Sequence, residues 1–356
     1  MSDNPGAAAA RECVQRLAAS EMLESDALNR AFDAIWAGNV SVARIAALLM
    51  GLRVKGETPQ EVAAIVGALR RAMVVLPAEA PETLVDTCGT GGGRIPTFNI
   101  STAAALLVAG AGARVAKHGN RSYTTKCGSA DVLEALGVSI EAPVEVLSAV
   151  LRDAGIVFMF APLMHPAMRF VAPVRGDLAI ETVMNIVGPL ANPAFAGRQV
   201  VGVAHERRLG LMAETLCELG STHALVVHGA GMDEISPLAA TQVLEVRDGM
   251  VRAWSVDPKR YGFGRGDAAE LAGGEPATNA RMIVSVLTGG GEAPPTATAA
   301  VVLNAAAALY VGGLAQDFDS GVEVARAALA QGLGLRALER MRDAFQRYGA
   351  LSSRGA

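Results

Sequence analysis

The sequence predicts an α/β protein: a small all-helical domain followed by a larger α/β domain with a mostly parallel central sheet. Residues 11–76 carry apolar side chains at helical spacing and no strand-like run. Residues 84–228 instead alternate short β-rich runs with Ala- and Leu-rich helical runs, which is typical of parallel strands covered by helices. We expect residues 1–77 to form the helical domain, with part of 163–190 packing on it, and residues 78–356 to form the α/β domain.

Capping residues mark the helices of the first domain. Apolar residues recur at helical spacing in the helix around residues 27–35. Ser41 is expected to cap a second helix at 42–52. The run Thr58-Pro-Gln-Glu61 combines a capping box with proline at the first helical position, and so begins a third helix. Residues 77–81, bounded by prolines, are predicted to be a linker.

The larger domain is predicted element by element. Its expected strands are residues 84–88, 114–117, 156–160, 199–204 and 224–228. Its expected helices are residues 102–111, 129–136, 144–154 and 206–219, while 162–193 is irregular with helical patches. A β-ribbon at 243–256 should turn at Asp248-Gly249, and later helices should begin near Asn279, Thr296, Ser320 and Leu335. Ligands of such sheets bind at the carboxyl ends of the strands.

Composition argues against several classes of protein. The net charge is -4 and no run of Lys or Arg exceeds two, so nucleic-acid binding is not expected. The four cysteines form no C-x-x-C pair, which argues against a zinc site or a disulfide framework. The first ten residues lack a basic region, and the apolar stretch 296–315 contains Asn304 without a basic flank. We therefore expect a cytoplasmic protein without signal peptide or membrane span.

A glycine cluster after the first predicted strand carries the strongest functional signal. Gly89-Thr-Gly-Gly-Gly93 ends the strand, and Thr97, Asn99, Ser101 and Thr102 then lead into a helix. Glycine lets backbone N–H groups approach an anion, and the start of a helix adds free N–H donors. We interpret the segment as a phosphate site, although it matches neither the Walker A loop nor G-x-G-x-x-G.

A second loop of the same kind follows the next predicted strand. It runs Lys117-His-Gly-Asn-Arg-Ser-Tyr-Thr-Thr125, and is rich in cations and hydroxyls. Two such loops one helix apart predict a ligand with more than one phosphate group. Alternatively, Lys117 and Arg121 are solvated and His118 is a structural histidine. The grouping with Gly119 and Asn120 favours a site.

Acidic and basic side chains complete the pattern. Asp233-Glu234 follow a strand and a Gly-x-Gly turn; adjacent acids on a loop are usually only solvated. At the carboxyl edge of the sheet, opposite two phosphate loops, they are expected to hold Mg²⁺, with Ser101 adding a hydroxyl. Arg175 lies in a Pro-bounded segment and is a candidate to bind a carboxylate. No G-x-S-x-G occurs, so the expected chemistry is electrostatic stabilisation of a leaving group.

The motifs at these positions resemble, in the same order, those of the anthranilate phosphoribosyltransferases. The resemblance implies a helical domain joined to an α/β domain, and a homodimer that contacts through the helical part. It also implies transfer of the phosphoribosyl group of 5-phosphoribosyl 1-diphosphate to the amine of anthranilate, with Mg²⁺, in tryptophan biosynthesis. The motifs that carry the resemblance lie at 46–58, 89–102, 117–131, 165–168, 185–193 and 233–236.

The resemblance also implies roles for individual residues. The residues expected to bind 5-phosphoribosyl 1-diphosphate are Gly89, Gly92, Gly93, Thr97, Asn99, Ile100, Ser101, Thr102, Lys117, His118, Gly119, Asn120, Arg121, Ser122, Tyr123, Thr124, Thr125 and Ser129. Those expected to bind anthranilate are Gly89, Asn120 and Arg175. Those expected to bind the metal are Ser101, Asp233 and Glu234.

Two positions depart from the pattern of the family. Gly93-Arg94 replaces the Asp-Gly pair of the usual Gly-Thr-Gly-Gly-Asp-Gly, so a carboxylate is missing and an added cation can contact phosphate instead. Leu178-Ala-Ile-Glu-Thr182 replaces Leu-Gly-x-Arg-Thr, so Glu181 reverses a charge near the acceptor segment. The second departure leaves open the same transfer to another aromatic acid.

Two further alternatives belong to other classes. A pyrimidine-nucleoside phosphorylase shares the architecture, but its lysine-led Ser-Thr-Gly-Gly loop is absent from this sequence. A non-catalytic paralogue that binds nucleic acid should lose the acidic pair and gain a basic face. This chain keeps Asp233-Glu234 and is mildly acidic. We therefore expect an enzyme with no nucleic-acid or membrane partner.

Overall fold

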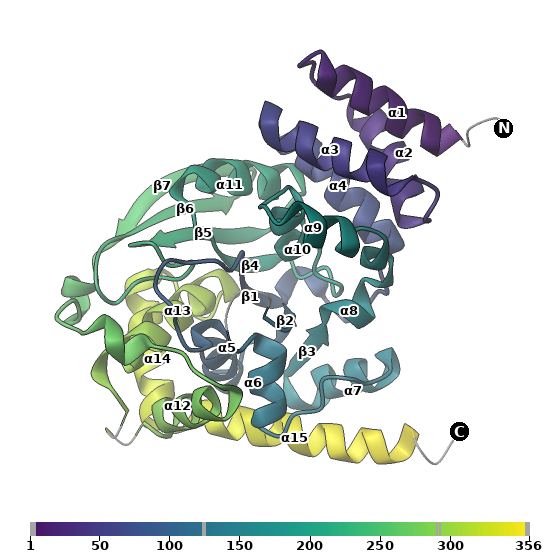
Figure 1. The fold of residues 1–356 in the computed structure, drawn as a ribbon. Helices are drawn as coiled ribbons and strands as arrows, with labels where there is room; N and C mark the ends of the chain where they lie inside the picture. The colour runs from purple at the N-terminus through teal and green to yellow at the C-terminus, as the bar shows by residue number, and fades with distance from the viewer. Residues whose placement is uncertain (1–4, 123–125, 290, 292, 353–356) are drawn as a thin grey trace.

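The centre of the molecule is a seven-stranded sheet with the strand order β3-β2-β1-β4-β5-β6-β7 (Figure 1). We describe a computed structural model in which residues 5–122, 126–289, 291 and 293–352 are placed. The five strands β1 to β5 pair in parallel, and β6 and β7 add an antiparallel edge, which confirms the predicted fold class. The strands are β1 Val85–Gly89, β2 Val115–Gly119, β3 Ile156–Phe160, β4 Arg198–Gly202, β5 His223–Gly229, β6 Thr241–Arg247 and β7 Met250–Val256.

Alternating side chains of the central strands enter two different cores. Leu225 and Val227 pack into one core, whereas Ala224 and Val226 pack into the other, as the two-residue period of a strand requires. The first core lies under α5 (Ile100–Gly110), α13 (Pro295–Gly312) and α15 (Leu333–Ser352). The second lies under α10 (Met184–Leu190) and α11 (Leu209–Glu218) and continues into the N-terminal helices. Both faces of the parallel sheet are therefore covered.

Two of the N-terminal helices, α3 and α4, begin directly after the predicted capping residues Ser41 and Thr58. The four helices are α1 Pro5–Ala18, α2 Ser25–Trp36, α3 Val42–Lys55 and α4 Pro59–Ala72. The Ser41 hydroxyl accepts a hydrogen bond from the Arg44 backbone at 3.4 Å, and Thr58 forms the predicted capping box with Glu61. Part of the irregular segment also packs here: α9 (Ala172–Leu178) contacts α3, and α10 contacts α4.

The other elements agree with prediction except around residue 204. The expected strand 199–204 ends at Gly202, and the expected helix 206–219 splits into a 3₁₀ turn, η3 (Glu206–Arg208), and α11. The ladder stops because the backbone N–H of Ala204 donates to the Thr90 hydroxyl, at 3.1 Å, rather than to a strand. The remaining elements are α6 Ser129–Ala135, α7 Val144–Ala154, α8 Ala161–Met164, α12 Pro276–Thr288, α14 Phe318–Ala330, and the 3₁₀ turns η1 Pro81–Thr83, η2 Pro166–Phe170, η4 Pro258–Tyr261 and η5 Ala268–Leu271.

Two local predictions are also confirmed. Asp248 and Gly249 both adopt left-handed backbone angles, with φ of 54° and 71°, as a tight β6–β7 hairpin turn requires. Helix α13 is long and apolar enough to span a membrane, but 78% of it is buried inside the fold. It is the central helix of the first core, as expected from its sequence.

Candidate active site

Four of the parallel strands end in glycine at the same edge of the sheet. The terminal residues are Gly89 in β1, Gly119 in β2, Gly202 in β4 and Gly229 in β5. A Cβ on Gly202 would lie 1.6 Å from the Asp233 carbonyl oxygen, and one on Gly89 would lie 2.5 Å from the Asp233 carboxylate. The strands therefore end without side chains so that the loop carrying the acidic pair can lie across the edge.

The two acids meet the first glycine loop and the start of α5. Asp233 accepts a hydrogen bond from the Gly91 backbone N–H at 2.8 Å. Burial raises the pKa of Asp233 above its ordinary value. Burial and the neighbouring Asp233 charge raise the pKa of Glu234 to about 8, although Lys117 and a hydrogen bond from the Ser101 backbone oppose this. A cation bound between the two carboxylates would relieve this unfavourable burial of charge.

Asn304 of helix α13 holds the loop that carries the acids. Its Oδ1 accepts from the Ile235 backbone N–H at 2.9 Å, and its Nδ2 donates to the Ile235 carbonyl at 3.0 Å. In the sequence, Asn304 argues only against a membrane span. A single amide within an otherwise apolar helix could have suggested a buried polar contact. The partner of that amide, Ile235, is known only from the packing of α13 against the loop.

Lys117 lies beneath the first loop, where it is only 3% exposed. Its ammonium donates to the Thr87 carbonyl and lies 3.3 Å from the Ser101 hydroxyl. Burial lowers the pKa of Lys117. The lysine therefore orients Ser101, the expected hydroxyl ligand of the metal, from below.

Asp86 provides the negative charge that faces this buried lysine. Its carboxylate accepts from the His118 backbone N–H at 3.2 Å and from the Asn192 amide at 2.8 Å. Burial raises the pKa of Asp86, and the attraction of Lys117 opposes that shift. Asp86 and Asn192 were not predicted as site residues, because their pairing joins positions more than a hundred residues apart.

Asn99 connects the two predicted phosphate loops. Its Nδ2 donates to the Cys127 carbonyl at 3.2 Å, and its Oδ1 accepts from Asn279 at 2.9 Å. Asn279 is buried near the start of α12 and also accepts from the Gly274 backbone at 2.7 Å. Asn279 thus supports the site from a helix that sequence analysis had not connected with it.

In the second loop, Arg121 is paired with two carboxylates of α6. The Arg121 guanidinium binds Asp131 at 2.7 Å and Glu134 at 2.6 Å, both on α6. The Asn120 carbonyl accepts from the Ser129 hydroxyl at 3.2 Å, which closes the loop onto the start of α6. The predicted site residues Tyr123, Thr124 and Thr125 lie outside the described residues.

Two buried histidines meet between the second loop and the segment that leads to Arg175. The rings of His118 and His165 lie 4.9 Å apart. Burial holds the pKa of His118 well below its ordinary value and lowers that of His165 to about 4, so both are neutral at pH 7. Within the described ranges, Nε2 of His118 has no hydrogen-bond partner, and His165 has none of ordinary geometry, although the nearby Ala191 backbone opposes the fall of its pKa. Buried nitrogens of this kind are suited to meeting a polar ligand or water.

The segment that carries Arg175 includes the position of reversed charge. Arg175 is partly buried in α9, and its carbonyl accepts from the Ala179 N–H at 3.1 Å, which closes the helix. Ala179 has a φ of 49°, a left-handed conformation that suits the glycine usual at this position in the family. Glu181 hydrogen-bonds to His205 at 3.0 Å, so the reversed charge has a partner on the segment after β4.

The donor set fits Mg²⁺ bound together with a phosphate ligand. Within the described ranges, no three His, Cys, Asp or Glu side chains gather to enclose a metal by themselves. Mg²⁺ is usually held by one or two carboxylates plus phosphate oxygens and water. Asp233, Glu234 and the Ser101 hydroxyl form an open site of this kind.

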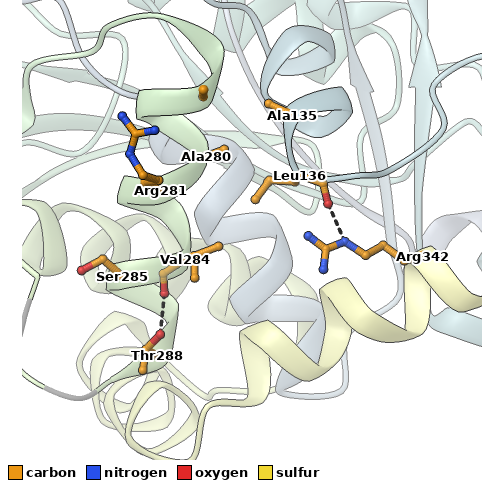
Figure 2. Close-up of a pocket in the computed structure, with 9 residues that line it drawn as sticks. Ala135, Leu136, Ala280, Arg281, Val284, Ser285, Thr288 and Arg342 are labelled. Atoms are coloured by element: carbon orange, nitrogen blue, oxygen red, sulfur yellow. Dashed lines mark hydrogen bonds between the residues drawn. The ribbon is translucent and has the colours of Figure 1, made fainter.

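A groove of about 560 Å³ lies elsewhere, between α6, α12 and α15 (Figure 2). It contains no carboxylate and none of the predicted site residues. Its lining residues are Ala135, Leu136, Ala277, Ala280, Arg281, Val284, Ser285, Thr288 and Arg342. The chemistry-bearing groups are instead gathered at the open carboxyl edge of the sheet, where loops rather than an enclosed cavity would hold a charged ligand.

Comparison with known proteins gives consistent matches along the chain. The models of the "Glycosyl transferase family, helical bundle domain" and the "Glycosyl transferase family, a/b domain" match residues 11–73 and 81–335. The anthranilate phosphoribosyltransferase of Rubrobacter xylanophilus is 46% identical over 347 residues, covering 97% of this chain and 99% of that protein. That of Methanocorpusculum labreanum is 45% identical, covering 93% and 96%.

Two solved structures are similar over nearly their whole length. The anthranilate phosphoribosyltransferase of Thermus thermophilus has a TM-score of 0.88 and 41% identity, covering 94% of this chain and 99% of that one. The enzyme of Saccharomyces cerevisiae in complex with PRPP and Mg has a TM-score of 0.86 and 25% identity, covering 96% and 98%.

Proposed function

The chain belongs to the anthranilate phosphoribosyltransferase family, and we infer that it transfers the phosphoribosyl group of 5-phosphoribosyl 1-diphosphate (PRPP) to the amine of anthranilate in tryptophan biosynthesis. The products are N-(5-phosphoribosyl)anthranilate and diphosphate. The observation that supports this most directly is the meeting of two glycine-bearing loops and a partly buried acidic pair at one edge of the sheet.

We assign the diphosphate of PRPP to the Gly89–Gly93 loop and the start of α5. A Mg²⁺ ion bound there with the substrate would supply positive charge that neutralises the diphosphate leaving group. Ser101, Asp233 and Glu234 would hold the ion, and Lys117 fixes Ser101 from below. The second loop, from Lys117 to Ser129, would face the rest of PRPP, with Asn99 joining the two loops.

The reaction then needs orientation and charge stabilisation more than proton transfer. The C1–O bond breaks, the diphosphate leaves with the electron pair, and the ribose becomes oxocarbenium-like. The lone pair of the anthranilate amine forms the new C1–N bond, and a proton then leaves the nitrogen. An aryl amine is uncharged at pH 7, so no strong base is required before attack. Fixed loops and preorganised dipoles supply this kind of catalysis.

We assign anthranilate to the side of the site that carries Gly89, Asn120 and Arg175. A guanidinium can hold the anthranilate carboxylate through two parallel hydrogen bonds. The neutral imidazoles of His118, in the second loop, and His165, before the Arg175 segment, contact each other and offer polar groups without adding charge.

Arg175→Ala is expected to raise the KM for anthranilate by about 10- to 100-fold, the loss expected for one charge-assisted contact. The KM for PRPP should stay near that of the unchanged protein. Initial rates from the loss of anthranilate fluorescence measure both constants. The matched control is Arg169→Ala, which removes an exposed arginine that packs over Phe170 in the same segment. An unchanged KM for anthranilate would remove Arg175 from the acceptor site.

The same fluorescence assay tests the function itself. Anthranilate fluorescence should decay only when the protein, PRPP and Mg²⁺ are all present, and EDTA should stop the decay. A folded protein that binds PRPP without consuming anthranilate would indicate transfer to another aromatic acid, the alternative that Glu181 leaves open. A folded protein that does not bind PRPP would indicate a non-catalytic paralogue.

We further propose a cytoplasmic homodimer whose contact lies on α3 of the helical part. Val42, Met50 and Val54 lie on one side of this helix, eight and four residues apart, and are 57%, 41% and 75% exposed. Exposed apolar stripes of this kind mark contact surfaces.

A division of the chain near residue 77 is supported by the family models, which end at residue 73 and resume at residue 81.

Val54→Glu is expected to convert the dimer to a monomer, because dimerisation would bury the new charge without a partner. Light scattering after size exclusion measures the mass directly. Val251→Glu is the matched control, since Val251 is 38% exposed on β7, away from the helical part. A dimeric Val54→Glu variant would place the contact elsewhere.

A further inference from the structure

We propose that Arg94 is a ligand of the PRPP diphosphate, a protein cation that this chain supplies where its family usually carries Asp-Gly. The proposal rests on the assignment of PRPP to the first glycine loop. It concerns a residue of the first loop that departs from the family pattern and was not among the residues assigned to bind PRPP.

The backbone fixes the position of Arg94 beside the acidic loop. Its N–H donates to the Gly231 carbonyl at 2.8 Å. The first carbons of its side chain lie along Gly231, since a Cβ built on that glycine would be 3.7 Å from Cβ and Cδ of Arg94. Gly231 is two residues before Asp233. The arginine therefore starts at the junction between the first glycine loop and the expected metal site.

The Arg94 guanidinium is available for a ligand. Arg94 is exposed, and among the residues that the structure places, none forms a hydrogen bond or ion pair with its side chain. Other arginines near the site differ: Arg121 binds two carboxylates on α6, and Arg208 binds Glu57 at 2.8 Å. Arg94 thus provides an unpaired planar guanidinium, which can donate two parallel hydrogen bonds to phosphate oxygens.

Gly93 explains why a cation can replace the carboxylate here. A Cβ on Gly93 would lie 3.3 Å from the Asp233 carboxylate, so an aspartate side chain at this position would start beside an existing acid. Glycine removes that third negative charge, and Arg94 adds a positive one. Relative to Asp-Gly, the local charge changes by two units in the direction that attracts a diphosphate.

The test is PRPP binding without turnover. The dissociation constant of PRPP would be measured by titration calorimetry at low salt with Mg²⁺ and without anthranilate, for the unchanged protein, Arg94→Ala, Arg94→Lys and Arg281→Ala. Arg94→Ala should bind PRPP about tenfold or more weakly, as expected for one lost charge-assisted contact. Arg94→Lys keeps the charge but not the planar guanidinium and should be intermediate. Arg281→Ala removes an exposed arginine from the groove of Figure 2 and should match the unchanged protein.

Each outcome has a distinct meaning. PRPP binding by folded Arg94→Ala that equals the unchanged protein would overturn the proposal while leaving the enzymatic function intact. An effect confined to the KM for anthranilate would also overturn it, since it would place Arg94 on the acceptor. Failure of the unchanged protein to bind PRPP would refute the proposed function before any variant is compared. Thermal unfolding of each variant shows whether it is folded, and Arg94→Lys, the mildest change, provides a second folded comparison.

Discussion

Neutralising the acidic pair, by Asp233→Asn with Glu234→Gln, is expected to lower kcat by about a thousandfold or more, the size of effect found when one preorganised electrostatic group is lost. Both amides keep nearly the shape of the acids, so the glycine-ended strands still accommodate the loop. What is lost is the pair of negative charges that would hold Mg²⁺ against the diphosphate. The leaving group then departs with its charge less neutralised, and the barrier rises.

The fold should tolerate this change. Burial raises the pKa of Glu234 to about 8 from an ordinary 4.5, so the metal-free folded protein releases the proton later than the unfolded chain does. Its stability therefore falls as pH rises from about 4.5 to 8. Removing the carboxylate removes that penalty, and the double variant should be at least as stable as the unchanged protein at pH 8. Loss of activity with an unchanged or raised Tm separates catalysis from folding.

Steady-state rates over a range of Mg²⁺ concentrations measure the effect. The control is Glu339→Gln with Asp343→Asn, which removes two exposed acids from α15 and should leave kcat unchanged. If the double variant at residues 233 and 234 turned over as fast as the unchanged protein, the assignment of these acids to the metal would be wrong.

The parts of this molecule that sequence could predict depend on neighbours along the chain. Ser41 accepts from a residue three positions ahead, and Asp248-Gly249 turn a hairpin by their own backbone preferences. The Gly89–Gly93 loop and the Asp233-Glu234 pair could be placed at one edge for the same reason. Each directly follows a parallel strand, and such strands all end on one side of a sheet.

The supporting contacts of the site could not be predicted because they join distant segments. Asn304 reaches Ile235 across 69 positions, and Asn279 reaches Asn99 across 180. Arg121 shows that packing can also pair a residue that sequence alone would leave free for a ligand. Its place in a cation-rich loop suggested a phosphate ligand, but the turn of α6 brings two carboxylates to its guanidinium. Local pattern identifies which groups are available, whereas packing decides which of them are already paired.

The electrostatic attraction between Asp86 and Lys117 leads to the largest expected effect on stability. Asp86→Ala should lower the free energy of unfolding by about 3–5 kcal/mol, the usual result of leaving one partner of a buried charge pair alone. Asp86 is completely buried, and its loss strands the Lys117 ammonium, which is 3% exposed. It also leaves the Asn192 amide, now bonded at 2.8 Å, without its carboxylate acceptor.

Removing the lysine as well should return part of this loss, because a buried pair replaced by apolar groups costs less than a pair that is half removed. Urea unfolding of Asp86→Ala, Lys117→Met and the double variant gives the free energies of unfolding for a double-mutant cycle. Asp177→Ala is the control, since Asp177 is exposed on α9. Additive losses would show that the two charges do not depend on each other. Activity should not recover along with stability: without its ammonium, residue 117 no longer fixes the Ser101 hydroxyl, so the double variant should be folded and still slow.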